Sequence, residues 1–387
     1  MKSLRAGIIG SGFMGAAHVE ALRRIGGVDI RAIASIDHPR AEEIAKQFDI
    51  DQVYDRWEEL LENPGIDVVH NCTPNNLHYQ INRAALEAGK HVISEKPLTI
   101  SSKESSELVE LSKKTRRVTA INFNYRFYPV IQHARNMIRD NRLGDIYLVH
   151  GNYLQDWLYY DTDYNWRLET EISGVSRAIA DIGSHWCDML QFLTGQKIVE
   201  VFADLVTIHK KRKKPEHDIE TFKGKEESFV SQYSEIEIKT EDTGSVLVHF
   251  ESGTTGVFTV SQVSAGRKNY FSFEIDGSKK ALAWNQEEPN QLWLGYREKP
   301  NEIIIKDPSL LDNEARTYAH YPGGHPEGYP DGPKNLFRNV YRFIREGKDP
   351  LKQEPDFPTF ADGHRENLIT EAVLESHKQK KWIDVKE

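Results

Sequence analysis

Apolar runs alternate with helix-like segments over the first third of the chain. The apolar run Ala6–Ile9 predicts a strand, and apolar residues at helical spacing follow it as far as Ile25. Further strands are predicted at residues 30–34, 52–54, 67–71, 91–94 and 117–121, with a helical pattern between each pair. Strands that alternate with helices predict a parallel, doubly wound sheet, which binds ligands at the carboxyl ends of its strands.

The pattern changes after about residue 124. An amphipathic helix is predicted at 129–140, and further helices at 183–193, 334–346 and 362–379. Runs with a period of two predict strands at 146–152, 198–206, 245–250, 255–262, 269–275 and 280–284. This favours a mostly antiparallel sheet. We therefore predict an α/β protein with a Rossmann domain over residues 1–123 and a second, α+β domain over residues 124–387.

Composition narrows the kind of partner. The chain has 387 residues and a formal net charge of -9, with both signs mixed along it, which argues against nucleic acid. No stretch of about 18 apolar residues is present, so we expect no membrane span. The start, Met-Lys-Ser-Leu, shows no signal peptide, and Cys72 and Cys187 have no metal-ligand spacing. We expect a cytoplasmic protein without a metal site, and a solvated loop over the charged segment 209–228.

The first predicted strand runs into Gly10-Ser11-Gly12-Phe13-Met14-Gly15. Gly10 allows a tight turn, Gly12 lets a pyrophosphate approach the backbone, and Gly15 allows close packing of the helix on the strand. The helix that follows offers unpaired N–H groups to phosphates. This placement predicts a dinucleotide site, the alternative being a strand-to-helix turn without a ligand.

The end of the second predicted strand bears on the choice of dinucleotide. An acidic residue that holds a ribose 2′-hydroxyl is expected there, but the position is Ser35, which would not repel a 2′-phosphate. Arg40 lies in the next helix's first turn, where a cation is unfavourable unless a phosphate offsets it. This favours NADP slightly over NAD. The alternative is a solvent-facing Arg40 behind an Asp37 helix cap.

Two further motifs point to proton chemistry. In Glu95-Lys96-Pro97, the proline favours an extended Lys96, whose ammonium would point into the crevice and bind a hydroxyl oxygen. In Asp181-Ile182-Gly183-Ser184-His185, the histidine is a natural proton acceptor at neutral pH, and Asp181 could orient it or bind a substrate hydroxyl. A surface Glu-Lys pair and a structural histidine are the alternatives.

Polar and aromatic residues gather in three stretches that suit a polyhydroxylated ring. They are 122–126, with Asn122, Tyr125 and Arg126; 155–157, Gln155-Asp156-Trp157; and 165–167, with Trp166 and Arg167. The alternative for each is ordinary loop content. We assign no role to Gly324–Tyr329.

These motifs together resemble the Gfo/Idh/MocA family. The resemblance covers essentially the whole chain and rests on the glycine motif, Thr73-Pro74-Asn75-Asn76-Leu77-His78, Glu95-Lys96-Pro97 and the Asp181/His185 pair, in this order. It implies a Rossmann domain followed by a domain with a large open sheet that commonly builds dimers or tetramers. It also implies NAD(P)-dependent oxidation or reduction of a secondary hydroxyl of a sugar, sugar derivative or cyclitol. The run 152–157 is similar to levoglucosan dehydrogenase-like members.

The resemblance carries roles to individual positions. It implies that His185 is the general acid/base and that Lys96 and Asp181 position the reacting hydroxyl, while Tyr125, Arg126, Gln155, Asp156 and Trp157 are expected to bind substrate. The implied cofactor positions are Gly10, Gly12, Phe13, Met14, Gly15, Ser35, Arg40, Thr73, Pro74, Asn75, Asn76, His78, Glu95, Lys96, Asn122, Trp166 and Arg167.

One segment departs from the family pattern. Many members have a run of glycines where this chain has Ser173-Gly174-Val175-Ser176-Arg177. This implies a stiffer loop and leaves the substrate's identity open. Two alternatives use the same fold: a glycosidase that oxidises its substrate transiently, and a non-enzymatic sugar-sensing regulator. The regulators lose the lysine or the histidine, and this chain keeps both.

Overall fold

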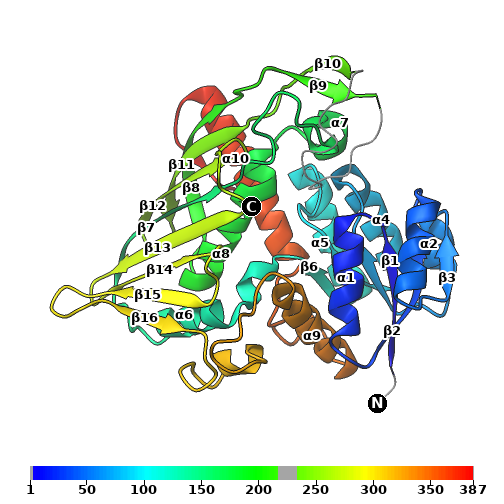
Figure 1. Ribbon diagram of the computed structural model, residues 1–387, viewed down its shortest axis with the longest axis horizontal. Coiled ribbons are helices and arrows are strands. Elements are labelled where there is room, and N and C mark those ends of the chain that lie inside the picture. The colour runs from blue at the N-terminus through cyan, green and yellow to red at the C-terminus, as the bar shows by residue number, and fades with distance from the viewer. Residues whose placement is uncertain (1–2, 217–232, 387) are drawn as a thin grey trace. The chain divides into compact units, whose positions relative to one another are not determined.

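The computed structural model describes residues 3–216 and 233–386, which form two compact units (Figure 1). Unit 1 comprises residues up to 127 together with 329–367, and unit 2 comprises 128–328 and the residues from 368 onward. The segment 329–367 therefore belongs to unit 1 although it follows most of unit 2 in sequence. No helix among the described residues is long and apolar enough to cross a membrane.

Unit 1 contains a six-stranded sheet in the order β3-β2-β1-β4-β5-β6, in which every pair is parallel. This confirms the predicted Rossmann sheet. Its strands are β1 (Leu4–Ile9), β2 (Val28–Ala34), β3 (Gln52–Tyr54), β4 (Val68–Asn71), β5 (His91–Ser94) and β6 (Thr119–Ile121). Its helices are α1 (Phe13–Arg23), α2 (His38–Gln47), α3 (Trp57–Glu62), α4 (Asn75–Glu87), α5 (Ser102–Thr115) and α9 (Asp331–Arg345), with a 3-10 turn at Asn124–Phe127.

The sheet of unit 1 is buried because helices connect its parallel strands. All four residues of β4 are buried, and the core continues through apolar residues of α3, α4 and α5. Phe360, at the start of α10 (Phe360–Gln379), belongs to the same core. The polar residues that end these strands therefore lie at one edge of a rigid sheet, where ligands bind.

Unit 2 contains a nine-stranded sheet in the order β16-β15-β14-β13-β7-β12-β11-β8-β17. Only the β12–β7 pair is parallel among its described pairs, which confirms the prediction of a mostly antiparallel sheet. Its strands are β7 (Ile146–Leu154), β8 (Ile198–Val206), β11 (Thr243–Phe250), β12 (Thr255–Ser261), β13 (Tyr270–Gly277), β14 (Ala281–Asn285), β15 (Gln291–Gly295), β16 (Glu302–Ile305) and β17 (Ile383–Asp384).

Buried and exposed residues alternate along these strands, so one face of the sheet is covered and the other is open. Helices α6 (Pro129–Arg139) and α8 (Ser184–Thr194) lie along the covered face (Figure 1). There Trp186 stacks on Phe258, with ring centroids 4.6 Å apart. Short helical segments at Trp166–Leu168, α7 (Thr170–Ser173) and Ala315–Tyr318 complete the unit.

The prediction of a loop over residues 209–228 is wrong for its first part. Lys211–Pro215 forms β9, which pairs with β10 (Tyr233–Glu237) in a separate antiparallel ladder. Opposite charges face each other in this ladder, with Lys211 Nζ 2.6 Å from Glu235 Oε1, so a charged sequence is compatible with strand pairing. Residues 217–228 lie outside the described residues. Strands β15, β16 and β17 were also missed from the sequence.

Candidate functional site

The glycine turn of unit 1 is shaped for close backbone approach. Gly10 has a φ of +106°, and a Cβ there would lie 2.6 Å from the carbonyl oxygen of Cys72. A Cβ at Gly15 would lie 2.1 Å from Gly10 O, whereas the space beside Gly12 is open within 4 Å. Gly12 caps α1, and no side chain among the described residues bonds to this cap. The first N–H groups of α1 and the gap at Gly12 fit a pyrophosphate.

Ser11, Ser35 and Arg40 meet beside this turn. The hydroxyls of Ser11 and Ser35 are 2.8 Å apart, and Arg40 donates from Nε to the backbone oxygen of Ser11 at 2.7 Å. Arg40 therefore folds back toward the glycine turn. Asp37 caps α2 by accepting a hydrogen bond from Arg40 N at 3.2 Å. The two neutral hydroxyls and the guanidinium therefore lie together beside the glycine turn.

His78 ties together two of the predicted cofactor loops. Its Nδ1 lies 2.7 Å from the carbonyl oxygen of Pro97 and its Nε2 lies 2.8 Å from that of Thr73, and a neutral ring donates a hydrogen bond to one of the two. Burial lowers the pKa of His78 even though both carbonyls favour the protonated ring. The loop Thr73-Pro74 leads into α4, whose first residues are Asn75, which is buried, and Asn76, which is exposed. His78 thus holds this helix start beside the Glu95-Lys96-Pro97 segment.

Glu95 is buried between the ends of the central strands, and Lys96 beside it is half-buried. Burial raises the pKa of Glu95, but the hydrogen bonds from His18 and Asn122 and the charge of Lys96 outweigh this, so the pKa is lowered and the carboxylate is charged. Asn122, 1% exposed, donates from Nδ2 to Glu95 Oε1. Its Oδ1 is buried and has no hydrogen-bond partner within residues 3–216 and 233–386. An orphaned acceptor at the strand ends fits a bound group that carries an amide N–H.

Tyr329 is a site residue whose role the sequence did not reveal. Its ring stacks on Phe13, with centroids 6.3 Å apart, and its hydroxyl lies 3.4 Å from Met14 Sδ. Tyr125 lies against the same ring, again with centroids 6.3 Å apart. Tyr329 is thus an aromatic cover over the glycine turn.

Arg126, expected to bind substrate, forms an ion pair with Asp362 at 2.9 Å.

In unit 2, Asp181 and His185 occupy consecutive turns. Asp181 lies in a π-helical turn, Ile179–Gly183, that continues into α8, and His185 lies in the first turn of α8, as predicted. Gln262 donates from Nε2 to Asp181 Oδ2 at 2.9 Å, and Arg167 Nε lies 3.6 Å from Asp181 Oδ1. The guanidinium of Arg167 also stacks 4.3 Å from the ring centroid of Trp166. Asp181 is therefore held as an oriented carboxylate.

A hydrogen-bonded chain of polar side chains lies beside His185. The Tyr153 ring is 6.1 Å from the His185 ring, and its hydroxyl donates to Asn269 Oδ1 at 2.6 Å. Gln155 donates to the same Asn269 oxygen at 3.0 Å and accepts from Trp157 Nε1 at 2.9 Å. Gln155 and Trp157 are thus linked through Asn269 to Tyr153, whose ring lies near His185. The sequence did not single out Tyr153 and Asn269, because no local motif marks contacts between distant strands.

Asp156 is engaged elsewhere in unit 2. Its Oδ2 accepts hydrogen bonds from Lys268 Nζ at 2.7 Å and Gly266 N at 3.1 Å. These contacts hold the turn before β13. Its predicted substrate contact stays a prediction.

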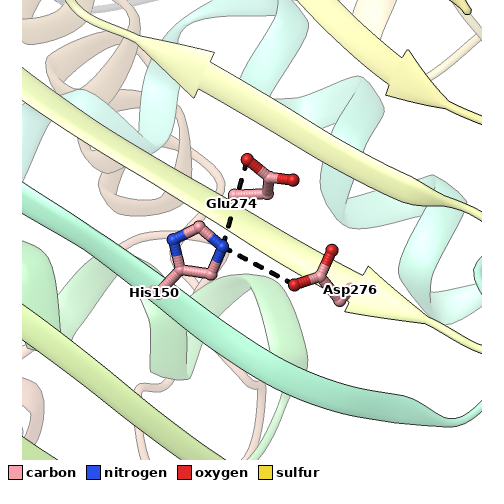
Figure 2. A group of neighbouring side chains, drawn as sticks. All are labelled: His150, Glu274 and Asp276. Atoms are coloured by element: carbon pink, nitrogen blue, oxygen red, sulfur yellow. Dashed lines mark ion pairs between the residues drawn. The ribbon is translucent and has the colours of Figure 1, made fainter.

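One group on the open face of the sheet could hold a metal ion. His150 lies on β7 opposite Glu274 of β13, and Asp276 follows two positions later on the same face (Figure 2). Each offers one ligand atom, and these atoms lie within 4.8 Å of one another. The distances from His150 Nε2 to the carboxylates are 4.0 and 3.6 Å, and the side chains are half-exposed. Exposed acidic groups are common without an ion, so the geometry assigns none. The expected lack of a metal site stays a prediction.

Comparisons with known proteins match both units. The family model described as "Oxidoreductase family, NAD-binding Rossmann fold" matches residues 4–123, and the "GFO/IDH/MocA C-terminal domain" model matches residues 131–283. Levoglucosan dehydrogenase of Pseudarthrobacter phenanthrenivorans is 28% identical over 100% of this chain and 99% of its own length. Myo-inositol 2-dehydrogenase of Thermotoga maritima is 28% identical over 52% of this chain and 58% of its own length.

Solved structures agree with these matches. A levoglucosan dehydrogenase in complex with NADH and L-sorbose superposes with a TM-score of 0.88, at 28% identity over 100% of both chains. An inositol dehydrogenase homolog from Azotobacter vinelandii, in complex with NADH and myo-inositol, gives a TM-score of 0.84 at 25% identity, covering 99% of this chain and 98% of that chain.

Proposed function

Because the chain belongs to the Gfo/Idh/MocA family of NAD-dependent oxidoreductases, we propose that it transfers hydride between NAD(P) and a secondary hydroxyl of a sugar, sugar derivative or cyclitol. The observation that carries this proposal is the full-length likeness to a levoglucosan dehydrogenase that binds NADH and L-sorbose. The glycine turn and the orphaned Asn122 oxygen support cofactor binding in unit 1.

In this proposal, three side chains serve the reacting hydroxyl. His185 accepts the proton of the reacting hydroxyl. Lys96 and Asp181 bind the oxygen of this hydroxyl and a neighbouring hydroxyl of the substrate, and so hold the substrate in place. The nicotinamide, when bound, supplies the hydride acceptor. One proton and one hydride leave the substrate, so the alcohol becomes a carbonyl. Asp181 suits its role because Gln262 and Arg167 already orient it.

The test is a panel of sugars and cyclitols with NAD and NADP, read at the nicotinamide absorbance band. Lys96→Met should abolish turnover and spare cofactor binding, because the ammonium acts on the substrate. Lys103→Met, at an exposed lysine of α5, is the matched control and should turn over like the wild type. Unchanged turnover in Lys96→Met would refute the catalytic assignment, and release of a sugar without net cofactor reduction would favour a glycosidase.

We further propose that the Ser11, Ser35 and Arg40 group accepts a 2′-phosphate, which gives NADP a slight preference over NAD. Arg40 folds back onto Ser11 and so places its charge beside the hydroxyl pair. Arg40→Ala should raise KM for NADP about tenfold, since a charge-assisted hydrogen bond is lost, and leave KM for NAD within twofold. Equal changes for the two cofactors would contradict this assignment.

We also propose that a second copy of the chain covers the open face of the unit 2 sheet, giving a homodimer or, through further contacts, a homotetramer. Leu247 is 43% exposed in the middle of β11, and its paired neighbours Phe202 and Val257 share its face. Ile303 and Ile305, 58% and 48% exposed, are further exposed apolar residues on β16, at one edge of the sheet. Exposed apolar side chains of this kind favour association.

A further inference from the structure

Two buried histidines of unit 1 take no part in the proposed chemistry, yet they reach the residue beside Lys96. His18 lies on α1 and His70 on β4, and both side chains are fully buried. Their Nδ1 atoms are 2.9 Å apart, so one ring donates a hydrogen bond to the other. Burying polar rings costs free energy unless their nitrogens are paired. The partners of the two remaining nitrogens therefore matter.

Both remaining nitrogens are paired. His18 Nε2 lies 2.9 Å from Glu95 Oε1, and His70 Nε2 lies 2.9 Å from the hydroxyl of Tyr341 on α9. Phe337 packs against both imidazoles, with ring centroids 4.6 Å from His18 and 4.9 Å from His70. Tyr341, His70, His18 and Glu95 thus form one buried chain of hydrogen bonds, which we call the histidine relay.

The chemistry of the ends sets the direction of these bonds. An ionised Glu95 only accepts, so His18 donates to it from Nε2. Burial raises the pKa of Tyr341 well above its usual value, so that hydroxyl keeps its proton. Burial lowers the pKa of His70 well below 6.5, so this ring carries one proton. With neutral rings, Tyr341 donates to His70 Nε2 and His70 donates from Nδ1 to His18.

We propose that the histidine relay is a positioning device for Lys96. It holds Glu95 as an oriented carboxylate, and the other oxygen of Glu95 accepts a hydrogen bond from Lys96 N at 3.3 Å. His70 and Tyr341 are positioning residues, because they act through Glu95 and not on the substrate. The inference rests on the proposed function, since Lys96 is the proposed ligand of the reacting hydroxyl.

Asn122, an expected cofactor-binding residue, is also connected to the histidine relay. It donates to the same Glu95 oxygen as His18, and its Nδ2 lies 3.2 Å from His18 Nε2. A carboxylate that is fixed by His18 therefore also fixes this amide. A loosened relay should disturb the geometry around Lys96 without removing any group that touches substrate.

The first test reads the relay directly and needs no variant. In the full-length protein with 15N-labelled histidine, we expect the His70 proton on Nδ1 and the His18 proton on Nε2 at neutral pH. A His70 proton on Nε2, or a doubly protonated His18, would overturn the proposed direction. This measurement does not depend on activity, so it stands apart from the proposed function.

The second test separates positioning from stability. Tyr341→Phe should lower kcat about fivefold, the effect of one lost hydrogen bond, and leave KM for the polyol within twofold. Tyr54→Phe removes a hydroxyl that bonds to Gln52 and Asn63, away from the relay, and should keep the wild-type kcat. An unchanged kcat in Tyr341→Phe, at any melting temperature, would overturn the positioning role.

A third variant disrupts the histidine relay more strongly. His70→Leu can neither donate nor accept, so its kcat should fall further, to about a tenth of the wild-type value. If this variant does not fold, Tyr341→Phe and the tautomer measurement still decide the matter. Wild-type turnover in Lys96→Met would contradict the proposed function. If Lys96→Met is inactive and Tyr341→Phe keeps the wild-type kcat, only the positioning role of the relay is contradicted.

Discussion

At the scale of single residues, His91 shows how a buried ring makes stability depend on pH. It begins β5, and its Nδ1 accepts a hydrogen bond from Val118 N at 2.9 Å. Burial, with a smaller contribution from Arg117, lowers its pKa from 6.5 to about 4. The unfolded chain therefore binds a proton between these values that the folded chain does not bind. Stability should fall as the pH drops through this window.

The size of this pH effect on the unfolding free energy can be measured. Between pH 6.5 and 4, protonation of unfolded His91 should remove up to about 3 kcal/mol of unfolding free energy. Denaturant unfolding across this range measures the slope, and His91→Gln should reduce it by a corresponding amount. Other buried histidines also contribute to this slope. The contribution of His91 is therefore the difference in slope between the wild type and His91→Gln. Equal slopes would show that His91 titrates normally in the folded chain.

Tyr329 allows a second prediction at this scale. Its ring covers Phe13 and Met14 at the glycine turn, so it should shield a bound dinucleotide from water. Tyr329→Ala should weaken cofactor binding about fivefold, whereas Tyr329→Phe should bind like the wild type because the ring remains. Tyr321→Ala, at a half-exposed tyrosine of unit 2, is the control. Titration calorimetry with NAD and NADP measures the effect, and equal affinities in all three variants would exclude a shielding role.

At the scale of elements, the sequence predicted what local pattern determines. The Rossmann strands were predictable because parallel strands buried on both faces are short apolar runs, as in the buried residues Ala6–Ile9 of β1. The glycine turn was predictable because only glycine tolerates the positive φ at Gly10. Strand β9 was missed because its charges suggested a loop, while the opposite charges that stabilise it come from β10.

The candidate site shows the same limit. Asp181 and His185 could be found because they lie four residues apart on one helical segment. Their partners could not. Gln262 lies 81 residues from Asp181, and a hydrogen bond between distant segments leaves no local signal in one sequence. The same holds for Tyr153, beside His185, and Asn269, which lie 116 residues apart. Tyr329 is more distant still from the glycine turn that it covers.

The segment before Asp181 gives a prediction for an element. Where many family members have glycines, this chain has Arg177, which is 1% exposed and forms an ion pair with Asp242. Asp242 also pairs with Arg212 at 2.9 Å, and Arg177 donates from Nη1 to Gln262 at 2.9 Å. Gln262 in turn holds Asp181. The expectation of a stiff loop thus has a physical basis in this buried ion cluster.

Asp242→Ala should leave two buried guanidinium groups without this carboxylate. We expect the unfolding free energy to fall by about 3–5 kcal/mol, as for other broken buried ion pairs, and kcat to fall because Asp181 loses its support. Asp204→Ala, which removes an exposed partner of Lys380, should change neither quantity. Thermal and denaturant unfolding measure the first effect. An equally stable Asp242→Ala protein would show that the cluster contributes nothing net.

At the scale of the whole molecule, the two units divide the candidate chemistry. Lys96 and the glycine turn belong to unit 1, and Asp181 and His185 belong to unit 2. Unit 2 also contains a nine-stranded sheet, most of which carries none of these candidate residues. One face of that sheet packs on α6 and α8, whereas the other presents half-exposed apolar side chains. The open face therefore needs a separate explanation, which the proposed second copy supplies.

The assembly proposal predicts a mass and a variant that changes it. The 44.5 kDa chain should elute from a sizing column with light-scattering detection at a multiple of that mass. Leu247→Asp places a charge on the open face, between Phe202 and Val257, and should shift the protein to a monomer because an unpaired charge is costly to bury. Leu351→Asp, at a leucine 51% exposed in unit 1, should leave the mass unchanged. A wild-type protein that is monomeric at micromolar concentration would exclude this interface, and a Leu247→Asp protein that keeps the full mass would place the interface elsewhere.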